Sequence, residues 1–224
     1  MEVASAILRR LAALRGLGSR GHLDELEATT ATLRRGASSS LDTDDRRLAR
    51  ALVAGEQEAF RVLVESETPQ VFRTCYRILG RVDEAEEATQ ETFVLAYRAL
   101  HTFRGDGPAG AWVARIATRE AWRRASLSAR RRSLTTTLDP AVMEAPAEGR
   151  GPLDHAIDAE EREHVRLAVE RLPEPYREIV TLRFFGELSI LEIASALGRP
   201  EGTIKAQLHR GLKRLRNRLE GTRA

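Results

Sequence analysis

The chain has 224 residues, a formal net charge of +3, 42% hydrophobic residues and a single cysteine. This hydrophobic content supports one domain or two small ones, and the lone cysteine excludes a disulfide within the chain. No apolar run reaches the length of a membrane span and the N-terminus lacks a signal-peptide core, so we expect a cytoplasmic protein.

Residues 1–41 predict an N-terminal appendage, partly disordered, and not a domain. A short amphipathic stretch near the start is interrupted by three glycines, and the sequence Gly36-Ala-Ser-Ser-Ser is typical of a flexible linker. The residues leave open whether this appendage is a marginal helix or a partner-binding arm.

Residues 42–129 predict a compact helical domain. Apolar residues recur there at helical spacing in four stretches. The predicted helices span 43–64, with a nick at Gly55, then 71–79, 83–100 and 109–129. Cys75 lies on the apolar stripe of the second helix, so we predict a buried thiol and not a reactive one.

The start of the third helix is strongly acidic. It reads DEAEEATQE from Asp83 and holds five carboxylates with no basic residue. Acids at a helix start interact favourably with the helix dipole, which accounts for part of the cluster. The remaining acids suit a basic protein partner. The alternative is a metal or acid–base site, but no histidine completes a ligand set, so we predict no metal.

The fourth helix is basic and carries both tryptophans. Its cluster comprises Arg115, Arg119, Arg123, Arg124 and Arg130 to Arg132, with Trp112 and Trp122 interleaved. Basic side chains with aromatic faces suit single-stranded nucleic acid, although a core position for Trp112 is an equal alternative. The preceding segment 105–110 matches G-x-G-x-x-G, but it follows a helix and contains proline. It therefore predicts a loop and not a dinucleotide site.

Residues 130–154 lose helical periodicity and contain three prolines, which predicts an interdomain linker. Residues 155–224 predict a second helical domain of four helices, the first two over 154–172 and 176–185. The overall prediction is an all-α protein with two small helical domains joined by a flexible linker.

The last two helices predict a helix-turn-helix. Ser189 and Glu192 have the spacing of a capping box, Gly198 suits a helix end, and Pro200 suits the start of the next helix. The second helix is predicted to bury Ile204, Leu208, Gly211 and Leu215. From 199 to 218 there are seven Lys or Arg and one acid, which favours DNA binding over a merely solvated face.

Taken together, these stretches resemble the extracytoplasmic-function group of bacterial RNA polymerase sigma factors. The resemblance covers residues 45–218. It rests on ALVAGEQEAF at 51–60, DEAEEATQETF at 83–93, FRG at 103–105, WVARIA at 112–117, LPEPYREIV at 172–180 and EGTIKAQLHR at 201–210. The order and spacing of these elements carry more weight than any one of them.

The resemblance implies a subunit that binds core RNA polymerase and directs promoter-specific transcription initiation, without catalysis or a cofactor. It implies docking on the β′ clamp coiled coil through Glu86, Glu87, Gln90 and Glu91, with a further contact to the β flap. Domain 42–129 would recognise the −10 element and help promoter melting through Phe103, Arg104, Asp106, Trp112, Arg115, Arg119 and Arg123. Domain 155–224 would recognise the −35 element through Thr203, Lys205, Ala206, His209, Arg210, Lys213 and Arg214. An anti-sigma factor is a further partner whose existence the residues leave open.

The chain departs from the family pattern at two places. Arg119 and Arg123 stand where relatives often carry Asn and Asp, which should strengthen phosphate contact and leaves the base preference at −10 open. Ala206 and Gln207 replace a common Ser-Arg pair. Ala206 can contact only a thymine methyl, whereas Arg210 can pair with guanine.

Two alternative functions each explain only part of the sequence. A stand-alone helix-turn-helix regulator would explain residues 189–218, but neither the acidic helix nor the helix with the tryptophans. An enzyme with carboxylate chemistry at 83–91 would need a ligand set that the sequence lacks.

Overall fold

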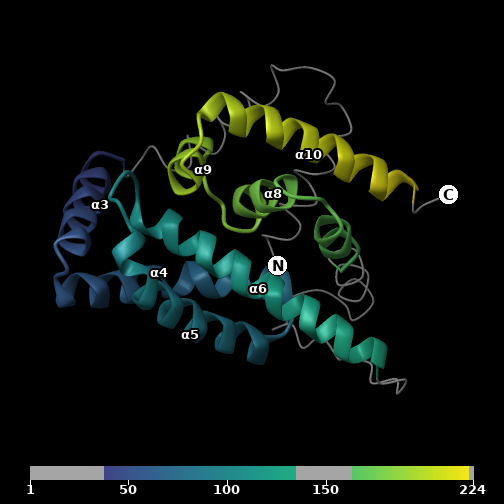
Figure 1. Cartoon of the computed structure of the whole chain (residues 1–224), viewed down its shortest axis with the longest axis horizontal. Helices are drawn as coiled ribbons and strands as arrows, with labels where there is room; N and C mark the ends of the chain where they lie inside the picture. The colour runs from purple at the N-terminus through teal and green to yellow at the C-terminus, as the bar shows by residue number, and fades with distance from the viewer. Residues whose placement is uncertain (1–37, 135–162, 222–224) are drawn as a thin grey trace, which may run out of the picture.

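The computed structural model describes residues 38–134 and 163–221, and every regular element in these two ranges is helical (Figure 1). The N-terminal unit consists of α3 (Ser38–Val53), α4 (Gln57–Leu79), α5 (Val82–Ala99), the 3-10 turn η3 (Leu100–Thr102) and α6 (Ala109–Leu134). The C-terminal unit consists of a helical stretch at 163–170, α8 (Tyr176–Phe184), α9 (Ile190–Leu197) and α10 (Glu201–Gly221). The predicted all-α fold with two helical units is confirmed. Most of the predicted appendage and linker lies outside the described residues.

Helix α4 is continuous where the sequence predicted two helices, so the predicted break between 64 and 71 is wrong. The helix passes through Pro69, and the break lies instead before it, at Gly55 with φ +78°. The buried stripe continues on both sides of the proline and comprises Ala59, Leu63, Val71 and Cys75. Because this stripe keeps its helical spacing, its packing against the neighbouring helices outweighs the one backbone hydrogen bond that the proline removes.

Two helices are longer than predicted. Helix α3 begins at Ser38, inside the predicted appendage 1–41, and α6 runs to Leu134, inside the predicted linker 130–154. Between Ala111 and Pro140 the chain has neither glycine nor proline, so no local signal stops α6 at residue 129.

Close helix packing in both units depends on small residues. In the N-terminal unit the buried alanines include Ala85, Ala88 and Ala96 on α5 and Ala117 and Ala121 on α6. In the C-terminal unit α10 crosses α8 at the buried Gly211. A Cβ atom there would lie 3.1 Å from Val180 Cγ2 and 3.2 Å from Tyr176 Cβ. The predicted burial of Gly211 is therefore confirmed, and the reason is the close approach of two helices.

The two units pack directly on each other. Helix α8 lies between α10 and α6, and α9 also contacts α6 (Figure 1). Arg77 of α4 donates to the carbonyl of Phe185 at 2.6 Å and pairs with Glu187 at 3.0 Å. This packing places the basic helix α6 against the unit that contains the helix-turn-helix.

Candidate nucleic-acid and polymerase interfaces

Helices α9 and α10 form the predicted helix-turn-helix. The Ser189 hydroxyl accepts from the backbone N–H of Glu192 at 3.2 Å, and the Glu192 carboxylate accepts from the backbone N–H of Ser189 at 2.7 Å. This reciprocal pair is the predicted capping box. Gly198 ends α9 in the left-handed conformation, with φ 62° and ψ 38°, and α10 begins directly after Pro200.

Helix α10 buries one face and exposes the other. Its buried residues are Ile204, Leu208, Gly211, Leu212 and Leu215. The proposed −35 residues that are exposed are Thr203, Ala206, His209, Arg210, Lys213 and Arg214, while Lys205 is half-buried. The Arg214 guanidinium lies 5.1 Å from the centre of the Tyr176 ring, which anchors it beside α8. The outward face of α10 therefore presents exposed neutral and basic side chains, with Arg210 and Lys213 one turn apart.

The two positions that depart from the family pattern in α10 have different surroundings. Ala206 is exposed, whereas Gln207 is half-buried, and its side-chain oxygen is buried without a hydrogen-bond partner among the described residues. Gln207 therefore lies on the flank of the outward face of α10, and Ala206 lies on the face itself.

The loop between η3 and α6 holds the first of the proposed −10 residues. Phe103 is buried, and its ring centre lies 5.3 Å from that of the partly buried Trp112. Arg104 and Asp106 are exposed. The loop follows a helical turn, so the prediction against a dinucleotide site at 105–110 is consistent with its surroundings. Phe103 is therefore a core residue, whereas Trp112 packs against the core and is partly exposed.

The proposed −10 arginines on α6 form ion pairs with carboxylates of the protein itself. Arg115 and Arg119 both donate to one oxygen of Glu178 on α8, with closest distances of 3.3 Å and 2.9 Å. Arg123 donates to Glu120 of its own helix at 2.7 Å.

Trp122 does not present the stacking face that the sequence suggested. Its side chain is 7% exposed, and its indole N–H donates to the hydroxyl of Thr181 at 3.1 Å. Its ring centre lies 6.4 Å from that of Phe185. The physical reason is tertiary, because α8 packs on the face of α6 that carries Trp122.

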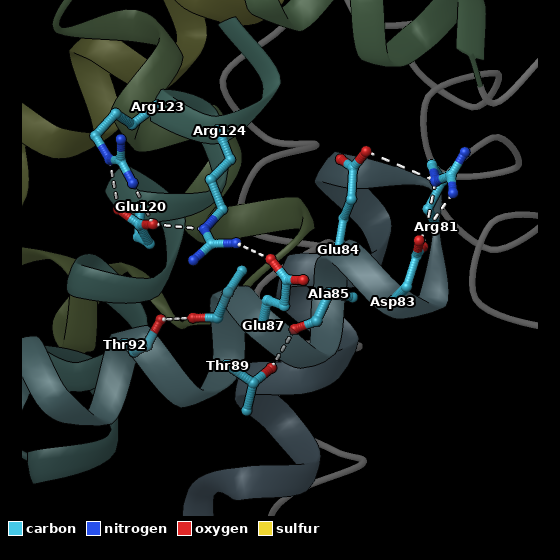
Figure 2. A network of polar contacts seen from close by, with 11 residues as sticks. Arg81, Asp83, Glu84, Ala85, Glu87, Thr89, Thr92, Glu120, Arg123 and Arg124 are labelled. Atoms are coloured by element: carbon cyan, nitrogen blue, oxygen red, sulfur yellow. Dashed lines mark hydrogen bonds and ion pairs between the residues drawn. The ribbon is translucent and has the colours of Figure 1, made fainter. Parts of the chain in front are cut away.

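Figure 2 shows the acidic helix α5 and the ion pairs around it. Arg81, just before the helix, pairs with Asp83 at 2.8 Å and with Glu84 at 3.6 Å. Arg124 of α6 pairs with Glu87 at 2.9 Å and with Glu120 at 2.6 Å, and so links the acidic helix to the basic one. The proposed docking residues Glu86, Glu87 and Gln90 are exposed, and Glu91 is partly exposed. Glu86 makes no ion pair with any residue that the structure describes.

The comparisons with known proteins divide the chain as the structure does. Residues 63–132 match sigma-70 region 2, and residues 162–215 match sigma-70 region 4. The ECF RNA polymerase sigma factor SigW of Bacillus subtilis (strain 168) is 32% identical over 174 residues, covering 74% of this chain and 91% of that protein. The chain belongs to the extracytoplasmic-function sigma factors. The ECF RNA polymerase sigma-E factor of Escherichia coli (strain K12) is 31% identical over 182 residues, covering 79% of this sigma factor and 94% of its relative.

A similar protein of solved structure has a lower sequence identity to this sigma factor than the two relatives above. A structure of CnrH in complex with the cytosolic domain of CnrY has a TM-score of 0.49 at 23% identity, covering 79% of this chain and 97% of that one. The resemblance drawn from the sequence is thus confirmed by the family matches and by the sequences of relatives. The function of the family, promoter-specific transcription initiation, is the function of this sigma factor.

Within 38–134 and 163–221 no group of His, Cys, Asp and Glu residues is arranged to hold a metal ion. Cys75 is fully buried, as predicted, and burial raises the pKa of its thiol to about 11. Among the described helices, none is both long and apolar enough to cross a membrane.

Sequence reasoning did not identify Glu120 and Glu178, the two carboxylates that pair with the arginines of α6. Glu120 has a local signal, because it lies three and four residues before the arginines that it binds. Glu178 has no such signal, because its partners Arg115 and Arg119 are about sixty residues away in the chain. Only the packing of α8 on α6 brings these groups together.

The network around Glu120 predicts a pH-dependent contribution to the stability of this sigma factor. Burial raises the pKa of Glu120, but hydrogen bonds and attraction from Arg123 and Arg124 outweigh it and hold the pKa below its usual 4.5. The ionised carboxylate therefore stabilises the fold above that value, and the stabilisation is lost as pH falls through the lower folded-state pKa. We expect Glu120→Gln to lower the free energy of unfolding at neutral pH by about 1–3 kcal/mol. Its stability should then fall less steeply than that of the wild type between about pH 5 and pH 2.

Urea unfolding at a series of pH values measures this difference. Glu65→Gln is the matched control, because Glu65 also pairs with an arginine, at 2.7 Å, but its side chain is 61% exposed. That variant should change stability by under about 1 kcal/mol. Parallel pH profiles for wild type and Glu120→Gln would contradict the prediction.

Proposed function

We propose that this sigma factor docks on core RNA polymerase through α5, holds the melted −10 strand along the loop before α6 and along α6, and reads the −35 element with α10. We propose no catalytic activity, and a place of action in the cytoplasm, where the polymerase works. The observation that carries the proposal is the segregation of charge. One exposed helix is acidic, and two helices on separate units are basic.

The acidic helix fits a basic protein surface better than it fits nucleic acid. Glu86 and Glu87 are exposed near its start and Gln90 and Glu91 follow one turn later, so four polar side chains share one stretch of surface. Carboxylates repel DNA phosphates and attract a basic coiled coil, which suits the β′ clamp. A region-2 match over the same residues supports this assignment.

The basic side chains of α6 fit a single strand. Arg115, Arg119 and Arg123 lie on successive turns of one helix, at intervals that can follow a phosphate backbone. Trp112 is partly exposed near the start of the same helix and offers part of a ring face. The arginines at 119 and 123 supply phosphate contact, which is independent of sequence.

The exposed side chain of Arg210 is the best candidate for base recognition in α10. We expect Arg210→Ala to weaken binding to the cognate −35 duplex by about 1–3 kcal/mol and to relax preference at one base pair, because a bidentate contact to guanine is lost. Competition binding against duplexes substituted at each position measures both effects. A similar loss on every sequence would instead identify Arg210 as a phosphate contact.

Transcription with purified components tests the proposal as a whole. Core RNA polymerase with this protein should yield transcripts from specific sites in a library of genomic fragments, and transcript sequencing would then give the promoter. A stand-alone helix-turn-helix regulator would bind DNA but would neither co-elute with core polymerase nor start transcripts. That pair of results would overturn the sigma-factor proposal.

A further inference from the structure

Gln207 shares one stripe of α10 with three side chains of the proposed −35 surface. Thr203, Gln207, Arg210 and Arg214 recur every three or four residues and fall within about 60° of arc around the helix. The other three side chains of the stripe are exposed, whereas Gln207 is half-buried. Gln207 is also one of the positions at which this chain departs from the family pattern.

This stripe borders the face of α10 that packs on α8 (Figure 1). Gly211 follows Gln207 by one turn, and a Cβ atom added there would lie 3.2 Å from Tyr176 Cβ. The Arg214 guanidinium lies 5.1 Å from the centre of the Tyr176 ring. Helix α8 therefore bounds the Gln207 side chain on one side, and the exposed outward face of α10 bounds it on the other.

The side-chain oxygen of Gln207 has no hydrogen bond in the free protein. This Oε1 atom is buried, and no residue that the structure describes donates to it. A buried acceptor without a donor costs free energy, because it has lost its hydrogen bonds to water and gained none in return. Moving the amide toward the outward face breaks no hydrogen bond to this oxygen, so the amide is available to a ligand on that face.

A glutamine amide matches one base in the major groove. Its carbonyl oxygen accepts from the N6 amino group of adenine, while its NH2 group donates to adenine N7. Guanine presents two acceptors on the same edge and so supplies no donor for a carbonyl oxygen. The Oε1 atom of Gln207 therefore fits adenine, whereas an arginine at the same position, which carries only donors, would fit guanine.

We infer that Gln207 reads an adenine of the −35 element, beside the guanine that Arg210 reads. This inference rests on the proposed function of α10. The two residues are separated by about 4.5 Å along the helix axis, and stacked base pairs by about 3.4 Å, so the two side chains reach neighbouring base pairs. Gln207 is then a specificity-determining residue, and its exchange for arginine changes which base is preferred.

Transcription from a pool of templates tests this inference. The full-length wild type and its variants, each assembled with core RNA polymerase, transcribe templates that carry one promoter with a randomised −35 element. The wild type should favour adenine next to the guanine whose preference is lost in Arg210→Ala. Gln207→Ala should lower the preference for that adenine about tenfold and change the other positions by under about twofold, and Gln207→Arg should shift the preference there to guanine.

Replacement of that adenine by 7-deazaadenine, which lacks the N7 acceptor, supplies a second measurement. Transcription by the wild type should fall about fivefold, whereas Gln207→Ala should be unaffected because it has no amide to donate. Asn217→Ala is the matched control, since Asn217 is exposed on the same helix two turns after Arg210 and its truncation also removes one amide. Its −35 preferences should equal those of the wild type.

The outcomes separate the inference from the proposed function. If Gln207→Ala keeps the adenine preference while the wild type transcribes from a defined −35 element, the inference is overturned and the proposed function stands. An equal loss on every template, together with a lower midpoint of urea unfolding, would show a packing role and also overturn it. If the wild type yields no promoter-specific transcript, the proposed function fails and the inference fails with it.

Discussion

Core RNA polymerase is expected to bind the double variant Glu86→Lys/Glu87→Lys roughly a hundredfold more weakly than the wild type, a loss of about 2.8 kcal/mol. Both side chains are exposed at the acidic start of α5. On a basic partner each reversal replaces an attraction with a repulsion. The Glu87 reversal also places a lysine beside Arg124, which now pairs with Glu87 at 2.9 Å. Fluorescence anisotropy of labelled sigma factor titrated with core polymerase measures the loss.

A second double variant separates docking from net charge. Glu58→Lys/Glu65→Lys makes the same change in net charge on α4, where both carboxylates are exposed and pair with Arg61. Polymerase affinity should then change by under about threefold, since these side chains lie outside the proposed docking surface. Thermal unfolding of both variants checks that the fold is retained. Equal losses for the two variants would remove the docking role of α5.

Ile193→Ala is expected to lower the stability of the C-terminal unit by about 2–5 kcal/mol and to abolish promoter binding at elevated temperature. Ile193 is fully buried in α9, and its truncation leaves a cavity in the core of the helix-turn-helix. A small helical unit has limited total stability, so a loss of this size depopulates the form that presents α10. Urea unfolding followed by circular dichroism, with duplex binding measured in parallel, tests the effect.

Leu191→Ala provides the matched control for this variant. Leu191 lies on the same helix two residues earlier, but its side chain is 65% exposed. Truncation there removes almost no packing, and the expected change in the free energy of unfolding is within about 0.5 kcal/mol. A comparable loss in both variants would show that burial is not the cause. If Leu191→Ala alone weakened transcription without destabilising the fold, its side chain would belong to an interface.

Local signals predicted the helix-turn-helix almost completely. The capping box at Ser189, the left-handed Gly198 and the buried stripe from Ile204 to Leu215 all involve residues within a few turns of one another. The same local reasoning failed at Pro69, because a proline usually ends a helix and only the packing of α4 against α5 and α6 keeps it intact. It also failed for Trp122, whose burial depends on a helix far along the chain.

By itself, the sequence determined the helical fold, the two units and the charge of each helix. These properties follow from periodicity, capping and composition, which act over short distances along the chain. The family followed from the resemblance of several motifs, in their order and spacing, to those of known sigma factors. Only the tertiary structure decided which charges are neutralised and which surfaces are covered. Glu178 reaches Arg115 and Arg119 because α8 packs on α6, and no local pattern encodes a contact between segments so far apart. The sequence therefore predicts the residues of the proposed −10 surface, but it does not predict that Glu178 pairs with Arg115 and Arg119.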